Sequence, residues 1–456
     1  MSARLLMLAA VAGLQGCASV VSTAPLPTLA AVEPAPVWRS LQPHSGVPVA
    51  PDWWGRFEDP VLDALVVRAL ERNVDVALAA ARVDEARAQS RLAHAALSPT
   101  ADLGLGGQQS RALNAFGQTY EAASGQPDLR VGYEVDLWGR LASLDAAGRA
   151  ALQGSVSAQA TVRLSVAAAV ARTYVGLRSL DAQLQVTRDT AAARAESARV
   201  ARRRYDAGYS GELEAAQAEA ELAAARQRVP ALELAIARQE NALSVLCGSV
   251  PGAVARGQTL TALALPVPSA GVPSDLLRQR PDIASAEAQL VAADASLHAS
   301  RAQFLPQVRL SASLSRLFTE TLDDPVTLWS AGGSILAPLF NGGRIRAQGD
   351  VAEARRDQAA LVYRGVVLNA FADVETALSA QNRLAIQEVA IETQRRAVTR
   401  AYVLAQNRYR AGYAGYLEEI DAQRGVLATD LAWIQVRESR LLTSIALAQA
   451  VGGGWS

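Results

Sequence analysis

Two cysteines and three histidines are the residues of this 456-residue chain best suited to nucleophilic or metal chemistry. The histidines, His44, His94 and His298, are scattered along the chain, and their spacing matches no metal-ligand pattern. The glycines near residue 104 do not complete a dinucleotide-binding fingerprint, because Gln109 stands where the last glycine is needed. No phosphate-binding loop motif occurs in the sequence. The sequence therefore predicts no enzyme, no metal site and no cofactor.

Cys17 is the one residue whose surroundings predict a covalent modification. An apolar run from Leu5 to Leu14 follows Arg4, which is typical of a secretory signal and too short for a permanent membrane-spanning helix. Gly16, the small residue directly before Cys17, makes this segment resemble the bacterial lipoprotein signal. That resemblance implies cleavage before Cys17, a diacylglycerol on its sulfur and a palmitoyl group on its amino terminus. Three acyl chains would anchor the mature chain firmly to a membrane. The alternative is a plain secretory signal with a fortuitous cysteine.

The charge balance and the second thiol narrow the classes of protein further. The 44 basic and 44 acidic residues cancel, which excludes the strong positive charge of a typical nucleic-acid binder. Half of the residues are hydrophobic but only 5% are aromatic, so alanine must supply much of the apolar surface. Cys247 ends an apolar run and is predicted to be buried and inert.

The chain is internally duplicated, which predicts a repeated architecture. The segment 202–211 is repeated at 406–415, an offset of 204, and Ser98-Pro99 is answered by Leu305-Pro306 at an offset of 207. Between these matches, 136–140 aligns with 338–344 once a two-residue insertion is allowed. The predicted organisation is a signal peptide at 1–16, a lipid-anchored Pro-rich segment at 17–59, a first repeat at 60–247, a connector at 248–273, a second repeat at 274–451 and a tail at 452–456.

Each repeat is predicted to hold a first helix, two strands and two long helices. Strict alternation of apolar and polar residues, as from Val308 to Ser315, indicates strands with one apolar face. Proline-free spans of about 66 residues follow the strands, and a helix of that length is roughly 100 Å long. Glycines at 208 and 412 are placed to end these helices. The expected ranges are helices at 60–96, with a break near Asn73, and 274–304; strands at about 101–109, 129–137, 307–317 and 326–337; and long helices at about 141–207, 212–247, 345–411 and 416–451, with Pro230 as a possible kink.

The number of strands has a consequence for assembly. Four strands per chain are each about long enough to cross a bilayer when tilted, but four cannot close a barrel. Open strand edges are not tolerated in lipid, so several chains would have to share one barrel. The predicted fold class is a mixed α+β membrane protein with internally duplicated, long α-helical hairpins. The alternative is a four-stranded sheet in a soluble α+β domain.

Several motifs, in this order, make the chain resemble the outer membrane factor family, most closely its lipoprotein, nodulation-type branch. They are Leu276 to Ile283, Ala286 to Leu290, Ala302 to Pro306, Tyr409 to Gly412 with Tyr416-Leu417, and Asp421 to Arg424. The resemblance covers essentially the whole mature chain. It implies a homotrimer in the outer membrane of a Gram-negative bacterium, with a twelve-stranded barrel of transmembrane strands and a coiled-coil periplasmic tunnel. It also implies a periplasmic adaptor protein and an inner-membrane transporter, driven by protons, as partners.

The same resemblance implies a gate at the periplasmic ends of the helices. The matching gate residues are Tyr409, Leu417, Asp421 and Arg424, of which the last three can share one helix face. In a trimer, three copies of Asp421 would form an anionic ring that favours cations. The alternative is that Asp421 and Arg424 form an ordinary surface pair worth under about 1 kcal/mol.

The two repeated turns are the second site that the resemblance implies. Tyr205 with Gly208, and Tyr409 with Gly412, would be docking points for the adaptor. Their alternative role is to form the turns and nothing more.

The expected function is a passive exit duct for small molecules in a tripartite efflux pump. A second hypothesis is a type I secretion channel for proteins or peptides with the same architecture. A third, of another class, is a non-conducting envelope lipoprotein that acts as a scaffold.

Overall fold

The computed structural model describes residues 28–40, 48–113, 115–320 and 323–454. Cys17 with its signal segment lies outside the described residues, as does His44. The chain forms two compact units. The sheet unit contains Asp84–Gly154 and Ala286–Arg364, and the helical unit contains Val32–Val83, Ser155–Ser285 and the chain from Gly365 onward. Each unit takes residues from both sequence repeats, so a repeat is not itself a structural unit.

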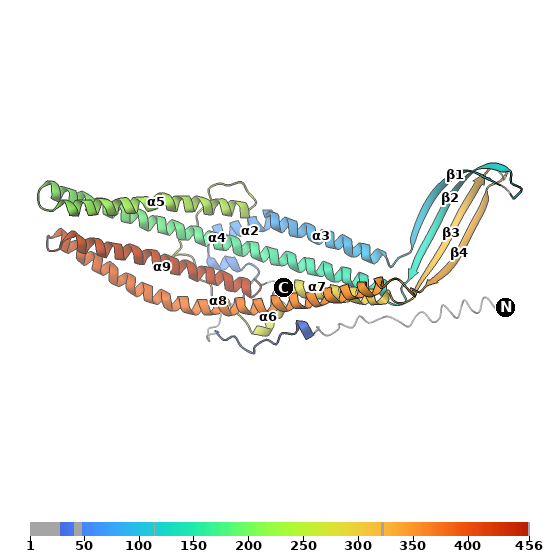
Figure 1. The fold of residues 1–456 in the computed structure, drawn as a ribbon. Helices are drawn as coiled ribbons and strands as arrows, with labels where there is room; N and C mark the ends of the chain where they lie inside the picture. Colours follow the sequence, from blue (N-terminus) through green and yellow to red (C-terminus); the bar gives the residue numbers. More distant parts are fainter. Residues whose placement is uncertain (1–27, 41–47, 114, 321–322, 455–456) are drawn as a thin grey trace. The chain divides into compact units, whose positions relative to one another are not determined.

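The sheet unit is built on four antiparallel strands in the order β1-β2-β3-β4 (Figure 1). The strands are β1 (Thr100–Leu113), β2 (Thr119–Val135), β3 (Gln307–Thr319) and β4 (Val326–Leu336). Apolar and polar rows alternate across the sheet: Leu103, Leu129, Leu314 and Trp329 are paired in one row, and Asp102, Arg130, Ser313 and Ser330 in the adjacent row. Because successive side chains point to opposite faces, one face is apolar and the other polar.

The first hairpin is longer than its predicted strands. β2 begins at Thr119 rather than near residue 129, and β1 continues to Leu113 rather than residue 109. Gly125 and Pro127 interrupt the apolar alternation at the start of β2, so periodicity alone does not reveal this part of the strand.

Four long helices dominate the described part of the chain, and the two longest, of 67 residues each, agree closely with the proline-free spans. The four are α4 (Arg140–Asp206), α5 (Glu212–Leu246), α8 (Arg344–Arg410) and α9 (Tyr416–Ala450). Gly208 and Gly412, with φ of 73° and 79°, follow α4 and α8 in the left-handed conformation that ends a helix. Pro230 lies inside α5, which continues through it. No helix in the described part of the chain is both long enough and apolar enough to cross a membrane.

The shorter helices show one correct and one wrong prediction. The first segment is divided at Asn73 into α2 (Pro60–Arg72) and α3 (Val74–Ala95), as expected. The single helix predicted over 274–304 is wrong, because Arg280 separates α6 (Pro273–Gln279) from α7 (Pro281–Ala302). Arg280 is extended, with φ of −97° and ψ of 123°, since the ring of a following proline disfavours the helical conformation of the residue before it.

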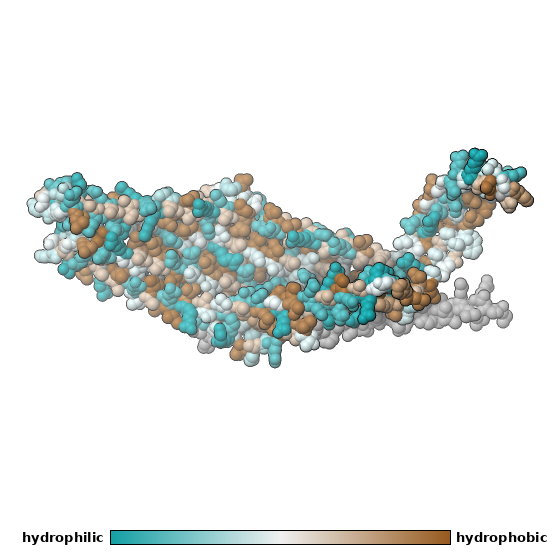
Figure 2. Space-filling view, viewed as in Figure 1, coloured by the Kyte–Doolittle hydropathy of each residue, from teal (hydrophilic) through white to brown (hydrophobic). Residues whose placement is uncertain are grey.

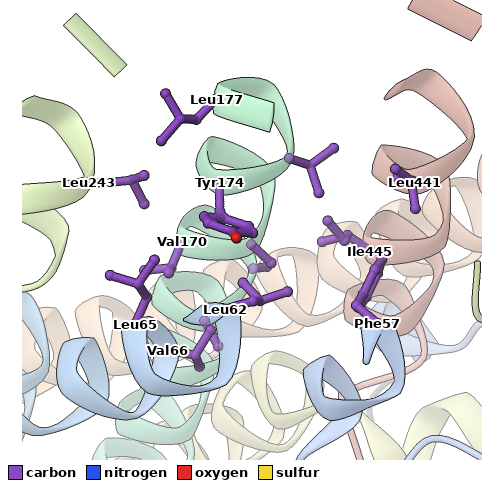
Figure 3. Close-up of a cluster of buried hydrophobic side chains, with 14 of the residues drawn as sticks. Phe57, Leu62, Leu65, Val66, Val170, Tyr174, Leu177, Leu243, Leu441 and Ile445 are labelled. Atoms are coloured by element: carbon purple, nitrogen blue, oxygen red, sulfur yellow. The ribbon is translucent and has the colours of Figure 1, made fainter. Parts of the chain in front are cut away.

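The core of the helical unit gathers residues that are distant in sequence (Figure 3). Val170, Tyr174 and Leu177 of α4 are fully buried, together with Leu62 of α2 and Leu441 of α9. These three α4 residues are spaced four and three positions apart, which is the apolar spacing of a helix packed along one seam. Cys247 is buried too, and burial raises the pKa of its thiol, which agrees with an inert role. Outside the core, apolar and polar residues are interspersed over the visible face of the helices (Figure 2).

Asp59 joins the connector to this core. Its carboxylate caps α2 by accepting the Val61 N–H at 2.8 Å, and it also accepts the Tyr174 hydroxyl at 2.7 Å and the Gln258 N–H at 2.9 Å. The Gly257 N–H in turn donates to the Tyr174 hydroxyl at 3.0 Å. Because a fully buried carboxylate needs several donors, these hydrogen bonds hold the connector in one position against α2 and α4.

Candidate gate at the helix tips

The two turns that connect the long helices have the same backbone. In the α4–α5 turn, the Tyr209 N–H donates to the Arg204 carbonyl at 2.8 Å, and in the α8–α9 turn the Tyr413 N–H donates to the Arg408 carbonyl at 2.9 Å. Tyr209 and Tyr413 are more than four-fifths exposed at the turns. The turns differ in side-chain environment, because Tyr409 is buried whereas Tyr205 is only half-buried.

Tyr409 connects the end of α8 to the other hairpin. Its hydroxyl donates to Glu214 Oε1 of α5 at 2.5 Å. Arg204 of α4 lies over its ring, 4.3 Å from the centroid, and also donates to its backbone carbonyl at 3.2 Å. Burial, and then the hydrogen bond to Glu214, raise the pKa of Tyr409, so the hydroxyl remains a neutral donor. In Tyr205 the corresponding ring contacts Arg202 of its own helix.

Arg424 makes a stronger contact than the one predicted. Its guanidinium pairs with Glu221 of α5 at 2.6 and 3.1 Å, whereas Asp421 lies at 3.4 Å. Glu221 also pairs with Arg194 of α4 at 2.8 Å, and the Arg194 side chain is only 5% exposed. Burial acts to raise the pKa of Glu221, but the hydrogen bond from Arg424 and the charge of Arg194 outweigh it and lower that pKa.

Glu221, Arg194 and Glu214 are contacts of the candidate gate that the sequence does not predict. They stand on helix segments where charged residues recur every few positions, so no local pattern distinguishes them. The duplication offered one signal, since positions 217 and 220 of the first repeat lack the charges of Asp421 and Arg424. Because the two hairpins carry different charges at these positions, Arg424 of the second hairpin can pair with a carboxylate of the first, Glu221.

Leu417 and Asp421 lie on α9 without burial in this chain. Leu417 is 60% exposed, and the Asp421 side chain is 63% exposed. The structure thus brings Tyr409 and Arg424 into contacts with the first hairpin and leaves Leu417 and Asp421 accessible. This leucine and this carboxylate lie four positions apart, about one helical turn, on the exposed surface of α9.

A polar seam lies beside these contacts, between α9, α4 and α8. Glu419 is 3% exposed and accepts a hydrogen bond from the Ser197 hydroxyl at 3.4 Å. Burial raises the pKa of Glu419 and raises that of the neighbouring Tyr416 to about 12. The Gln423 side chain is buried in the same row. The tips therefore combine these polar contacts with a small apolar cluster, whose buried members are Ala198, Ala201, Ala218, Tyr409, Tyr416 and Ile420.

Comparison with known proteins defines the class. The family model "Outer membrane efflux protein" matches residues 65–249 and 272–453, which are the two sequence repeats. The chain belongs to this family. It is accordingly an efflux protein of the outer membrane, and its family is one of channels.

Individual relatives agree with this assignment. The chain is 34% identical over 415 residues to the pyoverdine export outer membrane protein OpmQ of Pseudomonas aeruginosa, covering 88% of this chain and 87% of that protein. It is 31% identical over 466 residues to the toluene efflux pump outer membrane protein TtgC of Pseudomonas putida, covering 100% of this chain and 96% of that protein.

Solved structures of channels have the same fold. CusC, described as forming a transmembrane channel, is 30% identical with a TM-score of 0.83, covering 93% of this chain and 98% of that one. The Neisseria gonorrhoeae MtrE outer membrane channel, solved in its open state, is 27% identical with a TM-score of 0.83, covering 94% of this chain and 98% of that one.

Proposed function

We propose that three copies of this chain form the gated exit duct of a tripartite efflux pump that expels small molecules. The observation that carries the proposal is the four-stranded sheet with two open edges that the described residues form, followed along the chain by hairpins of one 67-residue and one 35-residue helix. Three copies would supply twelve strands, enough for a closed barrel with an aqueous lumen. The apolar sheet face would then meet lipid and the polar face would line the duct.

The tip contacts support a gate that is closed by default. Tyr409 and Arg424 both reach from the second hairpin to carboxylates of α5, at Glu214 and Glu221. Breaking these bonds would free the α8–α9 hairpin while each hairpin keeps its own helix pairing. We call the two bonds from Tyr409 to Glu214 and from Arg424 to Glu221 the latch. The adaptor would dock at the Tyr205–Gly208 and Tyr409–Gly412 turns and act on this latch. Exposed Asp421 would form the anionic ring of the trimer.

The energy source and the anchor belong to the same proposal. An inner-membrane transporter, driven by protons, would power export through the adaptor. Cys17 would carry the acyl groups that anchor the chain to the outer membrane. Relatives that serve pyoverdine export and toluene efflux support small organic molecules over proteins as the cargo.

Conductance separates a duct from a scaffold. The purified protein should form ion-conducting channels in planar bilayers, and a protein that inserts without conducting would support a non-conducting envelope scaffold. Drug susceptibility and secreted proteins of a deletion strain then separate the two kinds of cargo. Increased drug sensitivity with an unchanged set of secreted proteins is the expected result, and the reverse would indicate type I secretion.

The latch is tested by a matched pair of substitutions. Tyr409→Phe removes the bond to Glu214 and should raise single-channel conductance, whereas Tyr205→Phe at the equivalent turn should not. Asp421→Ala with Arg424→Ala should also raise conductance without loss of trimers. Equal conductance of Tyr409→Phe, Tyr205→Phe and the unmodified protein would refute this latch.

A further inference from the structure

A cavity of about 410 Å³ lies in the helical unit, between residues 48–58, the connector and α9. Small-molecule sites in proteins have volumes of about 300–1,000 Å³, so this cavity is of a size to hold one. Its walls are mostly apolar, and they include Trp53, Phe57, Leu265, Val267 and Ala448. The two aromatic residues stand on a short helix, η2 (Trp53–Phe57), and Phe57 also belongs to the core drawn in Figure 3. The walls therefore suit an apolar molecule.

Hydrogen bonds fix the walls of the cavity against one another. The Ala264 N–H donates to the Phe57 carbonyl at 3.2 Å, which joins the connector to η2. The Ser444 hydroxyl donates to the Pro266 carbonyl at 2.6 Å, which joins α9 to the connector. Ligand sites are usually formed before the ligand arrives, and these two bonds give the cavity that property.

Trp53 supplies a hydrogen-bond donor to this apolar site. Its side chain is 3% exposed, and its indole N–H is buried with no hydrogen-bond partner among the residues that the structure describes. A buried donor without an acceptor is unfavourable, because the group has lost its hydration and gained no bond in exchange. Ser444, the other buried polar side chain of the wall, already has its partner. A ligand with an oxygen acceptor would give Trp53 the bond that it lacks.

The charges at the cavity cancel. Arg56 and Glu58 are the charged side chains among the described residues of the wall, and both residues are exposed. Glu58 has φ of 56°, in the left-handed region that residues with side chains rarely adopt, and such strained residues are common at ligand clamps. One positive and one negative side chain leave no net charge to attract an ion. An uncharged ligand therefore suits the site best.

We propose that this cavity binds a neutral, lipophilic small molecule whose carbonyl or ether oxygen accepts the Trp53 N–H. The site goes beyond the proposed exit duct, because it is built within one chain and lies away from the candidate gate. Ser444 of its wall is about 42 Å along α9 from Tyr416 at the tip.

Photolabelling with benzophenone tests the site in the purified full-length protein. Benzophenone is neutral and lipophilic, has a carbonyl acceptor, and attaches to neighbouring C–H bonds on illumination. Mass spectrometry should find saturable labelling of the peptides that contain 48–58 and 264–268. Ala264→Leu fills part of the cavity and should reduce this labelling at least about tenfold. Ala64→Leu is the matched control, because Ala64 lines a different cavity, of about 320 Å³, and should leave the labelling unchanged.

Competition tests the bond to Trp53 separately from the size of the cavity. Fluorenone and fluorene share one ring skeleton, but only fluorenone has a carbonyl. The ratio of their potencies in suppressing the label should fall about fivefold in Trp53→Phe, which is the effect of losing one neutral hydrogen bond. Trp54→Phe is the control, because Trp54 is the adjacent residue and is not part of the cavity wall. Comparing the ratio between variants removes the different partitioning of the two compounds into detergent.

Two results would overturn the proposal. Labelling that does not saturate, or that Ala264→Leu and Ala64→Leu reduce equally, would show that the cavity is not a binding site. A potency ratio that is the same in Trp53→Phe as in the unmodified protein would refute the bond to Trp53 and with it the stated class of ligand. The competition experiment does not use the Ala264 variant, so it is decisive even where that variant fails to fold.

Discussion

Replacing Glu221 with glutamine should weaken the helix tips far more than removing Arg424. The Glu221 carboxylate, 15% exposed, is shared by a buried arginine, Arg194, and by Arg424, which is 53% exposed. Breaking a buried ion pair by removing one partner costs about 3–5 kcal/mol, because the other charge remains buried without compensation. An exposed pair such as that of Arg424 contributes about 1 kcal/mol or less.

Hydrogen exchange at the α4–α5 tip would measure this difference, because local opening is read as a free energy. Since 1.4 kcal/mol is a tenfold change, Glu221→Gln should speed exchange of the tip amides by about 100-fold or more, and Arg424→Ala by less than about tenfold. Glu219→Gln is the control, because Glu219 stands on the same helix, is 60% exposed and lies 3.9 Å from Arg202. Equal exchange in the Glu221 and Glu219 variants, or faster exchange in Arg424→Ala than in Glu221→Gln, would refute the reasoning.

The same contact predicts the sign of an acid effect. The pKa of Glu221 is lower in the folded protein than the ordinary 4.5. The carboxylate therefore stabilises the tip above that value, and the stabilisation is lost as pH falls through the lowered pKa. In the unmodified protein, the protection factors of the tip amides, which compare exchange with that of an unprotected peptide, should fall below about pH 4.5. This fall should be smaller in Glu221→Gln, which has no carboxylate to protonate.

Three further changes test other parts of the chain. Asp59→Ala should lower the free energy of unfolding by about 3 kcal/mol or more, as measured by chemical denaturation. The substitution removes a helix cap and leaves the Tyr174 hydroxyl and the Gln258 N–H without their acceptor. Glu419→Gln should raise the melting temperature at pH 7 and leave it unchanged well below pH 4.5, because the raised pKa means that ionised Glu419 is disfavoured in the fold; a melting temperature that falls at pH 7 would contradict this. Cys17→Ser should abolish acylation, and palmitate labelling that persists in the variant would show that Cys17 is not the acceptor.

Much of the fold could be predicted because its signals are local or repeat along the chain. The apolar spacing at Val170, Tyr174 and Leu177 predicts a seam, and all three side chains are fully buried. Glycines at 208 and 412 end long helices because only a residue without a side chain readily adopts positive φ. The single helix expected over 274–304 is wrong because Pro281 disfavours the helical conformation of Arg280, the residue before it.

The sequence by itself determined the family, the strand alternation, the helix lengths and the two tyrosine turns, since each depends on neighbouring residues or on repetition. Only the tertiary structure decided which residues Tyr409 and Arg424 contact. Glu214 and Glu221 are about 200 residues away from them and are two among many charged residues on helices of similar composition. An ion pair between hairpins depends on how two long helices are rotated and shifted against each other. That alignment results from packing along their whole length, which no short pattern encodes.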